Sequence, residues 1–153
     1  MSGWLIDAHL FKHLAPGGGG RKPSFRDWVG GSKQPLYLSM ISLVEIEAEI
    51  VKFRARRHPE RAVAEPDKWL GGLVAHYGDR IHPVDAAVAR RAGQLMSRFR
   101  VRGFNALSNV LLAATAQIHD HGILTERGSE FRSWAGVELW DPFEGALPSK
   151  GGA

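Results

Sequence analysis

The sequence of 153 residues contains no cysteine, which excludes disulfide bonds and thiolate metal ligands. No apolar run reaches the roughly 18 residues that a membrane-spanning helix needs. The opening stretch, "MSGWLIDAHL", lacks the basic segment of a signal peptide and carries an aspartate among its apolar residues. We therefore expect a cytoplasmic protein with no membrane segment.

The glycine-rich stretch "GGGGRK" at 17–22 lacks the ending of a phosphate-binding loop. A phosphate-binding loop would end in Gly-Lys-Ser or Gly-Lys-Thr, whereas this stretch runs into Pro23. We interpret it as a surface loop.

The charge is basic, with a formal net charge of +4 from 20 Lys and Arg against 16 Asp and Glu. Three clusters hold much of it: "KFRARRH" (52–58), "ARR" (89–91) and "RFRVR" (98–102). Solvated helix faces and helix ends explain any single cluster, but three in one small domain favour a polyanionic partner such as nucleic acid. The candidate contacts are Arg54, Arg56, Arg57, Arg90, Arg91, Arg98, Arg100 and Arg102.

Length and periodicity predict one domain over residues 1–145, followed by a loose tail at 146–153. Short apolar runs predict strands at 4–7, 36–39, 80–84, 123–125 and 137–141. Helical spacing follows from residue 8, from Ser42, over 59–78 with a break at Pro66, over 85–99 with Asp85 as N-cap, and over 105–122 with Gly122 as the end. Strands that alternate with helices predict a mostly parallel sheet covered by helices on both faces.

Four polar residues share one place in this arrangement: Asp7, Glu45, Asn109 and Glu130. Each lies just beyond a strand or at the start of a helix, so we expect them to converge at the carboxyl ends of the strands. Oxygen ligands of this kind suit Mg²⁺ or Mn²⁺. We predict that the three carboxylates form one metal-sized cluster at that edge.

Each residue also has a purely structural interpretation. Asp7 could cap the helix that follows it, and Glu130 could be loop surface. Ser42 and Glu45 have the spacing of a helix capping box.

Four segments resemble, in order, the motifs of PIN domains, particularly the VapC-type toxins of bacterial toxin–antitoxin pairs. They are "WLIDAHLFKHL", "YLSMISLVEIEAEI", "NVLLAATAQIHDHGILTERGSEF" and "GVELWDPF", and together they span nearly the whole chain. The resemblance implies a three-layer α/β/α sandwich and RNA cleavage that depends on Mg²⁺ or Mn²⁺. It also implies inhibition by a small antitoxin protein and assembly as a homodimer.

Carried over by position, Asp7 and Glu45 match the first two acids of the family pattern. Asn109 stands where a third acid, usually Asp, begins the alanine-rich helix. Glu130 stands where an Asp usually precedes Phe131. Ser42 matches a supporting Ser or Thr before the second acid. The resemblance therefore makes Asp7, Glu45, Asn109 and Glu130 the catalytic and metal-binding residues.

The sequence departs from the pattern at several of these positions. Asn109 keeps a carbonyl oxygen but no charge, so we expect weaker cation binding and three acids that suffice for one metal ion. The first motif reads "DAH", which puts Ala8 and His9 where polar residues are usual. Arg127 stands where a small polar residue is common.

The histidines are candidate ligands of a second kind of metal site. His9 and His13 are four residues apart beside Asp7, a spacing that permits zinc, but no glutamate between them completes a protease motif. We interpret them as surface or rim residues. His119 and His121 flank Asp120 at a predicted helix end, where positive charge suits the helix dipole.

Two other functions remain compatible with the sequence. A PIN-like module with a degraded site could bind RNA or a protein partner without cutting, which the residues at positions 8, 9 and 109 favour. A small-molecule hydrolase could use the same acids, although no motif defines a small-molecule pocket.

Overall fold

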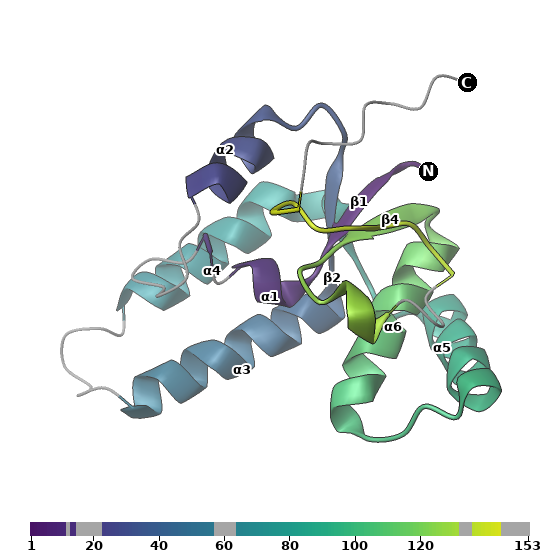
Figure 1. Cartoon of the computed structure of the whole chain (residues 1–153). Helices are drawn as coiled ribbons and strands as arrows, with labels where there is room; N and C mark the ends of the chain where they lie inside the picture. The colour runs from purple at the N-terminus through teal and green to yellow at the C-terminus, as the bar shows by residue number, and fades with distance from the viewer. Residues whose placement is uncertain (12, 15–22, 57–63, 132–135, 145–153) are drawn as a thin grey trace.

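The computed structural model describes residues 1–11, 13–14, 23–56, 64–131 and 136–144. Five parallel strands form one sheet in the order β3-β2-β1-β4-β5 (Figure 1). The strands are β1 (Gly3–Ile6), β2 (Leu36–Ser39), β3 (Ile81–His82), β4 (His121–Leu124) and β5 (Leu139–Trp140). The expected mostly parallel sheet is therefore confirmed.

Side chains of the central strands alternate between two cores. Trp4 and Ile6 of β1 pack into one core, whereas Leu5 between them packs into the other. Leu124 and Ile123 of β4 divide in the same way. Because both faces are covered, β1 and β4 are buried at every position.

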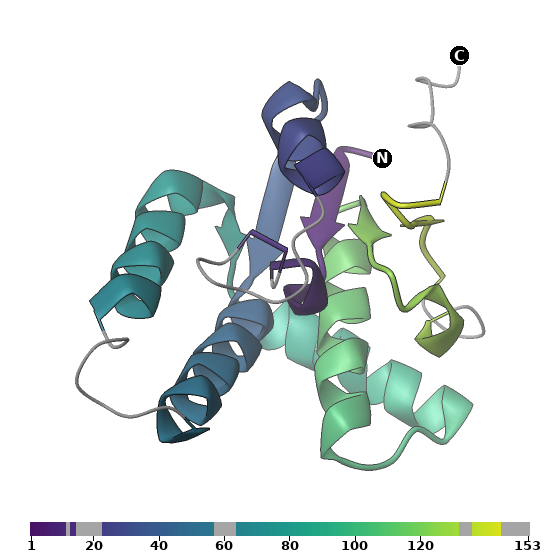
Figure 2. The same cartoon turned by 60° about the vertical axis from the view of Figure 1, so that its left-hand side comes forward.

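Four helices bury their apolar side chains in the first core. They are α1 (Ala8–Phe11), α2 (Pro23–Gly31), α3 (Met40–Arg56) and α4 (Ala64–Tyr77), followed by the short η1 (Gly78–Arg80). Figure 2 shows α3 and α4 on one side of the strands. Helix α2 was not predicted from the sequence; it begins at Pro23, a residue favoured in a first helical turn.

Two helices cover the opposite face: α5 (Ala86–Phe99) and α6 (Phe104–Ile118). Asp85 caps α5 as predicted, since its carboxylate accepts a hydrogen bond of 2.9 Å from the backbone N–H of Val88. The layers are thus helix, sheet and helix, which confirms the three-layer α/β/α sandwich. The 3₁₀ helix η2 (Gly128–Glu130) follows β4.

Two predicted helix starts need correction. Helix α3 begins at Met40 rather than Ser42, and the Ser39 hydroxyl accepts a hydrogen bond from Ile41 N–H at its start. Ser42 lies inside the helix and donates instead to the carbonyl of Ile6, so the capping box with Glu45 is wrong. Pro66 does not interrupt α4 but lies in its first turn, where a missing N–H costs nothing.

The end of α6 also differs from the prediction. The helix ends at Ile118, and Gly122 lies inside β4. A Cβ atom at Gly122 would collide with the Trp4 ring, so glycine serves strand packing there rather than helix termination.

Helix α6 is buried along only part of its surface. Val110 and Ala114 are buried, whereas Leu107 and Leu111 are half-buried and Ile118 is exposed. Helix α6 packs against the sheet, α5 and α3, so further residues are buried: Leu112, Ala113, Thr115 and Ala116.

Some expectations lie outside the described residues: the loop at 17–22, Arg57, and the tail at 146–153. Among the helices that the structure describes, none has the length and apolar character to cross a membrane.

Candidate functional site

Asp7 lies at the carboxyl end of β1 and is fully buried. Its backbone N–H donates to the carbonyl of Leu124, which extends the pairing of β1 with β4 by one step. The Thr125 hydroxyl, directly after β4, donates to Asp7 Oδ2 at 2.7 Å. The ends of the two central strands therefore fix the carboxylate.

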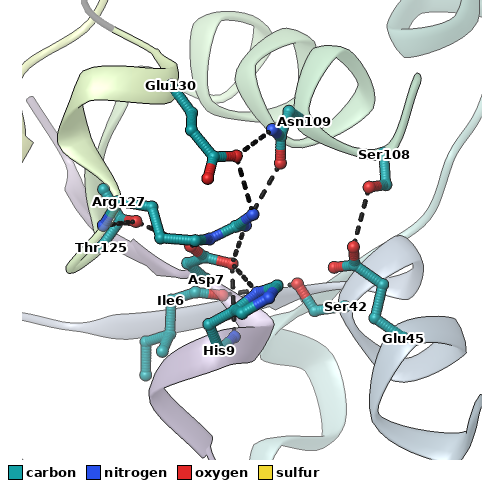
Figure 3. Close-up of polar contacts among 10 residues, drawn as sticks. All are labelled: Ile6, Asp7, His9, Ser42, Glu45, Ser108, Asn109, Thr125, Arg127 and Glu130. Carbon is teal, nitrogen blue, oxygen red and sulfur yellow. Dashed lines mark hydrogen bonds and ion pairs between the residues drawn. The ribbon is translucent and has the colours of Figure 1, made fainter. Parts of the chain in front are cut away.

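The guanidinium of Arg127 lies against this carboxylate (Figure 3). Its Nη2 is 2.9 Å from Asp7 Oδ1 and 3.0 Å from Oδ2, and its Nε is 3.1 Å from Oδ2. The Arg127 backbone N–H donates to Thr125 Oγ1 at 2.9 Å. Arg127 thus holds Asp7 with a fork of donors, a geometry that matches a carboxylate.

Asn109 and Glu130 complete the ring around the guanidinium. Arg127 Nη1 is 2.9 Å from Glu130 Oε2, and Arg127 Nη2 is 3.2 Å from Asn109 Oδ1. Asn109 Nδ2 donates to the same Glu130 oxygen at 2.9 Å. Oxygens from β1, α6 and η2 therefore converge on one positive group.

Glu45 approaches from α3 on the other side of the site (Figure 3). Its Oε1 accepts a hydrogen bond of 2.7 Å from the Ser108 hydroxyl, which joins α3 to α6. Ser42 is fully buried and ties α3 to the end of β1 through the Ile6 carbonyl, at 3.4 Å. This contact helps to position α3 against β1.

The electrostatics favour an ionised Asp7. Burial raises the pKa of its carboxyl, but hydrogen bonds from His9 and Arg127, the charge of Arg127 and the Thr125 hydroxyl outweigh burial and lower the pKa to about 2. Asp7 is therefore a buried negative charge at neutral pH, and it needs a positive partner.

The expected site residues all lie at the carboxyl edge of the sheet, as predicted, but their arrangement differs from the expectation. In the described part of the chain, no three Asp, Glu, His or Cys side chains are grouped so as to hold a metal ion. The predicted metal-sized cluster of Asp7, Glu45 and Glu130 is therefore wrong for this arrangement. The physical reason is that Arg127 lies among the acids and Glu45 turns to Ser108.

The donor set nevertheless fits a cation in kind. Two carboxylates and an amide carbonyl are the oxygen ligands that hard divalent cations prefer, and here they converge on a guanidinium that stands in for such an ion. Asp7, Asn109 and Glu130 are the residues that could hold it.

His9 and His13 do not form a zinc site. His9 Nδ1 lies 3.5 Å from Asp7 Oδ1, whereas His13 Nε2 lies 3.4 Å from Glu126 Oε2. The two rings therefore serve different carboxylates.

The arginines expected to bind nucleic acid fall into two groups. Arg54 pairs with Asp67 of α4, and Arg91 pairs with Gln117 and Gln94, so these guanidinium groups are already engaged. The described arginines with exposed side chains are Arg56, Arg90, Arg98, Arg100 and Arg102.

Three residues of the site were not predicted from the sequence as site residues: Thr125, Ser108 and Arg127. Thr125 directly follows an apolar strand, and Ser108 directly precedes Asn109, so both carried a positional signal. Arg127 was visible as a departure from the family pattern, but only the fold brings it to Asp7.

Known proteins resemble this chain in sequence and in fold. Ribonuclease VapC10 of Mycobacterium tuberculosis is 31% identical over 104 residues, which make up 65% of this chain and 67% of that protein. A chain in a structure of FitAB bound to an IR36 DNA fragment superposes with a TM-score of 0.74 at 20% identity, covering 95% of this chain and 99% of that one. A chain of a toxin–antitoxin complex from Klebsiella pneumoniae gives a TM-score of 0.62 at 17% identity, covering 92% and 98%.

No protein-family model matches the chain. This chain matches 67% of the length of the sequence relative, and the solved structures show the same fold over nearly the whole chain. This chain therefore belongs to the PIN-domain family, among the VapC-type toxins.

Proposed function

We propose that this chain is the toxin of a toxin–antitoxin pair, a cytoplasmic endoribonuclease that hydrolyses RNA with the help of Mg²⁺ or Mn²⁺. One observation carries the proposal: oxygens of Asp7, Asn109 and Glu130 converge on a single positive group at the carboxyl edge of the sheet. The likeness to a protein named ribonuclease supports RNA as the substrate.

A divalent cation bound at this place supplies activation of a water molecule and neutralisation of charge on the phosphate. Asp7, Asn109 and Glu130 would hold it. Two carboxylates and one amide carry less negative charge than three carboxylates, which favours one ion of modest affinity.

The side chains divide the remaining work. Asp7 stays ionised because its pKa is about 2, so it contributes a full negative charge at neutral pH. Glu45 is half-buried and oriented by Ser108, and it would accept the proton of the attacking water. Glu130 is 47% exposed, so it lies at the rim, where it would help to orient that water.

The test is cleavage of a labelled RNA by purified protein with saturating Mn²⁺ or Mg²⁺. The control is Asp7→Asn, which keeps the size of the side chain and removes its charge. We expect metal-dependent cleavage by the wild type, its loss with a chelator, and a loss of about a hundredfold or more in the variant. Circular dichroism checks that the variant folds. Equal cleavage by the two proteins would refute the assignment of Asp7.

The antitoxin partner and the homodimer also belong to the proposal. The Klebsiella pneumoniae neighbour is a toxin–antitoxin complex, which supports a protein partner. Met40, Val44 and Val51 are large apolar side chains that are about half exposed and fall on one face of α3. Such a row is a feature of protein interfaces. Sedimentation of the chain alone tests the dimer, and Val44→Asp would weaken an interface on α3.

A second function, binding RNA or a partner without cutting, is favoured by one observation. The guanidinium of Arg127 already neutralises Asp7 and Glu130. RNA binding without cleavage at any Mn²⁺ concentration would select this function over the first.

A further inference from the structure

Arg127 uses the same oxygens that a metal ion would need. Its three guanidinium nitrogens contact both oxygens of Asp7, one oxygen of Glu130 and the carbonyl oxygen of Asn109, at distances from 2.9 to 3.2 Å. A divalent cation and this guanidinium cannot share the oxygens, because like charges repel strongly at contact distance.

The protein fixes Arg127 in this place. Its backbone N–H is bonded to Thr125 Oγ1, and its guanidinium carbon lies 5.9 Å from the centre of the buried Phe131 ring. Arg127 itself is only 19% exposed. The positive charge therefore belongs to the site and does not come from a loosely held surface side chain.

Because Asp7 is buried, the Arg127 guanidinium can leave it only if another cation takes its place. Asp7 is fully buried and both of its oxygens contact the guanidinium, so removing Arg127 without a replacement would leave a buried carboxylate without this partner, which is strongly unfavourable. A metal ion can therefore enter only as Arg127 leaves. An RNA phosphate is a suitable destination for the guanidinium, since arginine binds phosphate oxygens in the same forked geometry as carboxylate.

We propose that Arg127 is a built-in competitor of the divalent cation: it occupies the acidic site in the free protein, and an RNA phosphate draws it away so that metal can bind. The inference rests on the proposed function for its RNA part. RNA and metal then promote each other's binding, because each removes the obstacle to the other.

Metal binding in the absence of RNA tests the competition directly. Mn²⁺ affinity is measured by calorimetry for the wild type, Arg127→Gln and Lys68→Gln. Arg127→Gln keeps side-chain donors but removes the charge, and Lys68→Gln removes an equal charge from an exposed side chain of α4. We expect Arg127→Gln to raise Mn²⁺ affinity about tenfold or more, and Lys68→Gln to leave it unchanged.

Arg127→Lys gives a second measurement should the glutamine variant not fold. A lysine keeps the charge but cannot form the fork, so we expect an Mn²⁺ affinity between those of wild type and the neutral variant. Equal Mn²⁺ affinity in the wild type and the Arg127 variants would overturn the proposal.

A short 2′-O-methyl RNA tests the role of the phosphate. We expect it to raise the Mn²⁺ affinity of the wild type several-fold and that of Arg127→Gln much less, because the obstacle is already absent there. No rise in the wild type would overturn the phosphate as the group that withdraws Arg127. These outcomes do not depend on cleavage. The proposed ribonuclease function fails separately, if neither the wild type nor Arg127→Gln cuts RNA at saturating Mn²⁺.

Discussion

Asp7 depends on its neighbours more than any other charged residue of the site. It is fully buried, and its two oxygens accept hydrogen bonds from Thr125 and Arg127. Thr125 is the smaller of these partners and is itself buried. Its hydroxyl both donates to Asp7 Oδ2 and accepts from the Arg127 backbone N–H, so it joins the acid to the turn that carries the arginine.

Thr125→Val should therefore destabilise the fold. Valine has the same shape but leaves Asp7 Oδ2 with one donor fewer and the Arg127 N–H without its acceptor, a loss of about 1–3 kcal/mol in the free energy of unfolding. Urea denaturation measures the change, with Ser129→Ala in the exposed part of η2 as the control. A Thr125→Val protein as stable as the control would show that this hydroxyl does not stabilise the fold.

Asn109 should limit the affinity of the site for metal. Asn109→Asp adds a negative charge to a side chain whose oxygen already faces the Arg127 guanidinium, 3.2 Å from its Nη2. In an Arg127→Gln background we expect Mn²⁺ affinity to rise about tenfold, while with Arg127 present the new carboxylate pairs with the guanidinium and the gain is smaller. Calorimetry measures both, and Gln94→Glu on exposed α5 is the charge control. An unchanged affinity in the Arg127→Gln background would mean that position 109 does not face the metal.

At the scale of elements, the close approach of β1 to the chain before β2 depends on Gly3. A Cβ atom there would lie 2.5 Å from the Pro35 carbonyl oxygen and 2.8 Å from the Tyr37 ring. The same Pro35 oxygen accepts the Trp4 N–H at 3.0 Å, so the backbone cannot move away without losing that bond.

Gly3→Ala should consequently cost about 1–3 kcal/mol of unfolding free energy, because the strands must separate locally. Gly93→Ala is the matched control, since a Cβ there meets no atom within 4 Å on the exposed face of α5. In a helix the control should gain about 0.5–1 kcal/mol. Similar changes in the two variants would contradict the steric argument.

The elements were predictable where local signals decide them. The bounds of β2 agree with the prediction because Pro35 precedes the strand and the β-rich run ends at Ser39. The end of α6 was not predictable, since Gly122 has the local signature of a helix stop but is required by the Trp4 ring, which is distant in sequence.

The site shows the same division. Their positions after strands and at helix starts predicted that Asp7, Glu45, Asn109 and Glu130 lie at one edge of the sheet. The place of Arg127 depends on the alignment of β4 beside β1, which no local pattern encodes.

At the scale of the whole molecule, the exposed arginines should govern RNA binding. The end of α3 and the connection from α5 to α6 both lie beyond the carboxyl ends of the strands, at the lower side of Figure 1. Arg98 is exposed in the last turn of α5, and Arg100 and Arg102 are exposed in that connection.

RNA affinity should fall steeply with salt, because each bound phosphate releases counterions. Replacing Arg98 and Arg102 by Gln should lower the slope of log affinity against log salt by about 0.7 for each lost phosphate contact. Fluorescence anisotropy of a labelled RNA across KCl concentrations measures the slope. Arg54→Gln is the control, since Arg54 is already paired with Asp67. A slope unaffected by the double substitution would place the RNA on another face.

A cluster of histidines lies at the other end of α6. His121 is buried, its Nε2 is 2.8 Å from His82 Nε2, and Tyr37 stacks on both rings. His119 stacks on His82 with ring centres 3.7 Å apart. Burial, with the charges of His82 and His119, lowers the pKa of His121 from 6.5 to about 4, although Asp120 opposes the shift.

This cluster should make the fold sensitive to mild acid. Above pH 6.5 His121 is neutral in both the folded and unfolded states and contributes nothing; as the pH falls from 6.5 towards 4, only the unfolded state takes up the proton. Each unit of pKa difference is worth ~1.4 kcal/mol, so the free energy of unfolding should fall by roughly 1–3 kcal/mol over that window. Urea denaturation at a series of pH values measures the fall. His121→Phe removes the titrating ring and should flatten the profile relative to wild type, whereas replacing the exposed His76 by Gln should leave the profile unchanged. A His121→Phe profile as steep as that of wild type would assign the acid sensitivity to other groups.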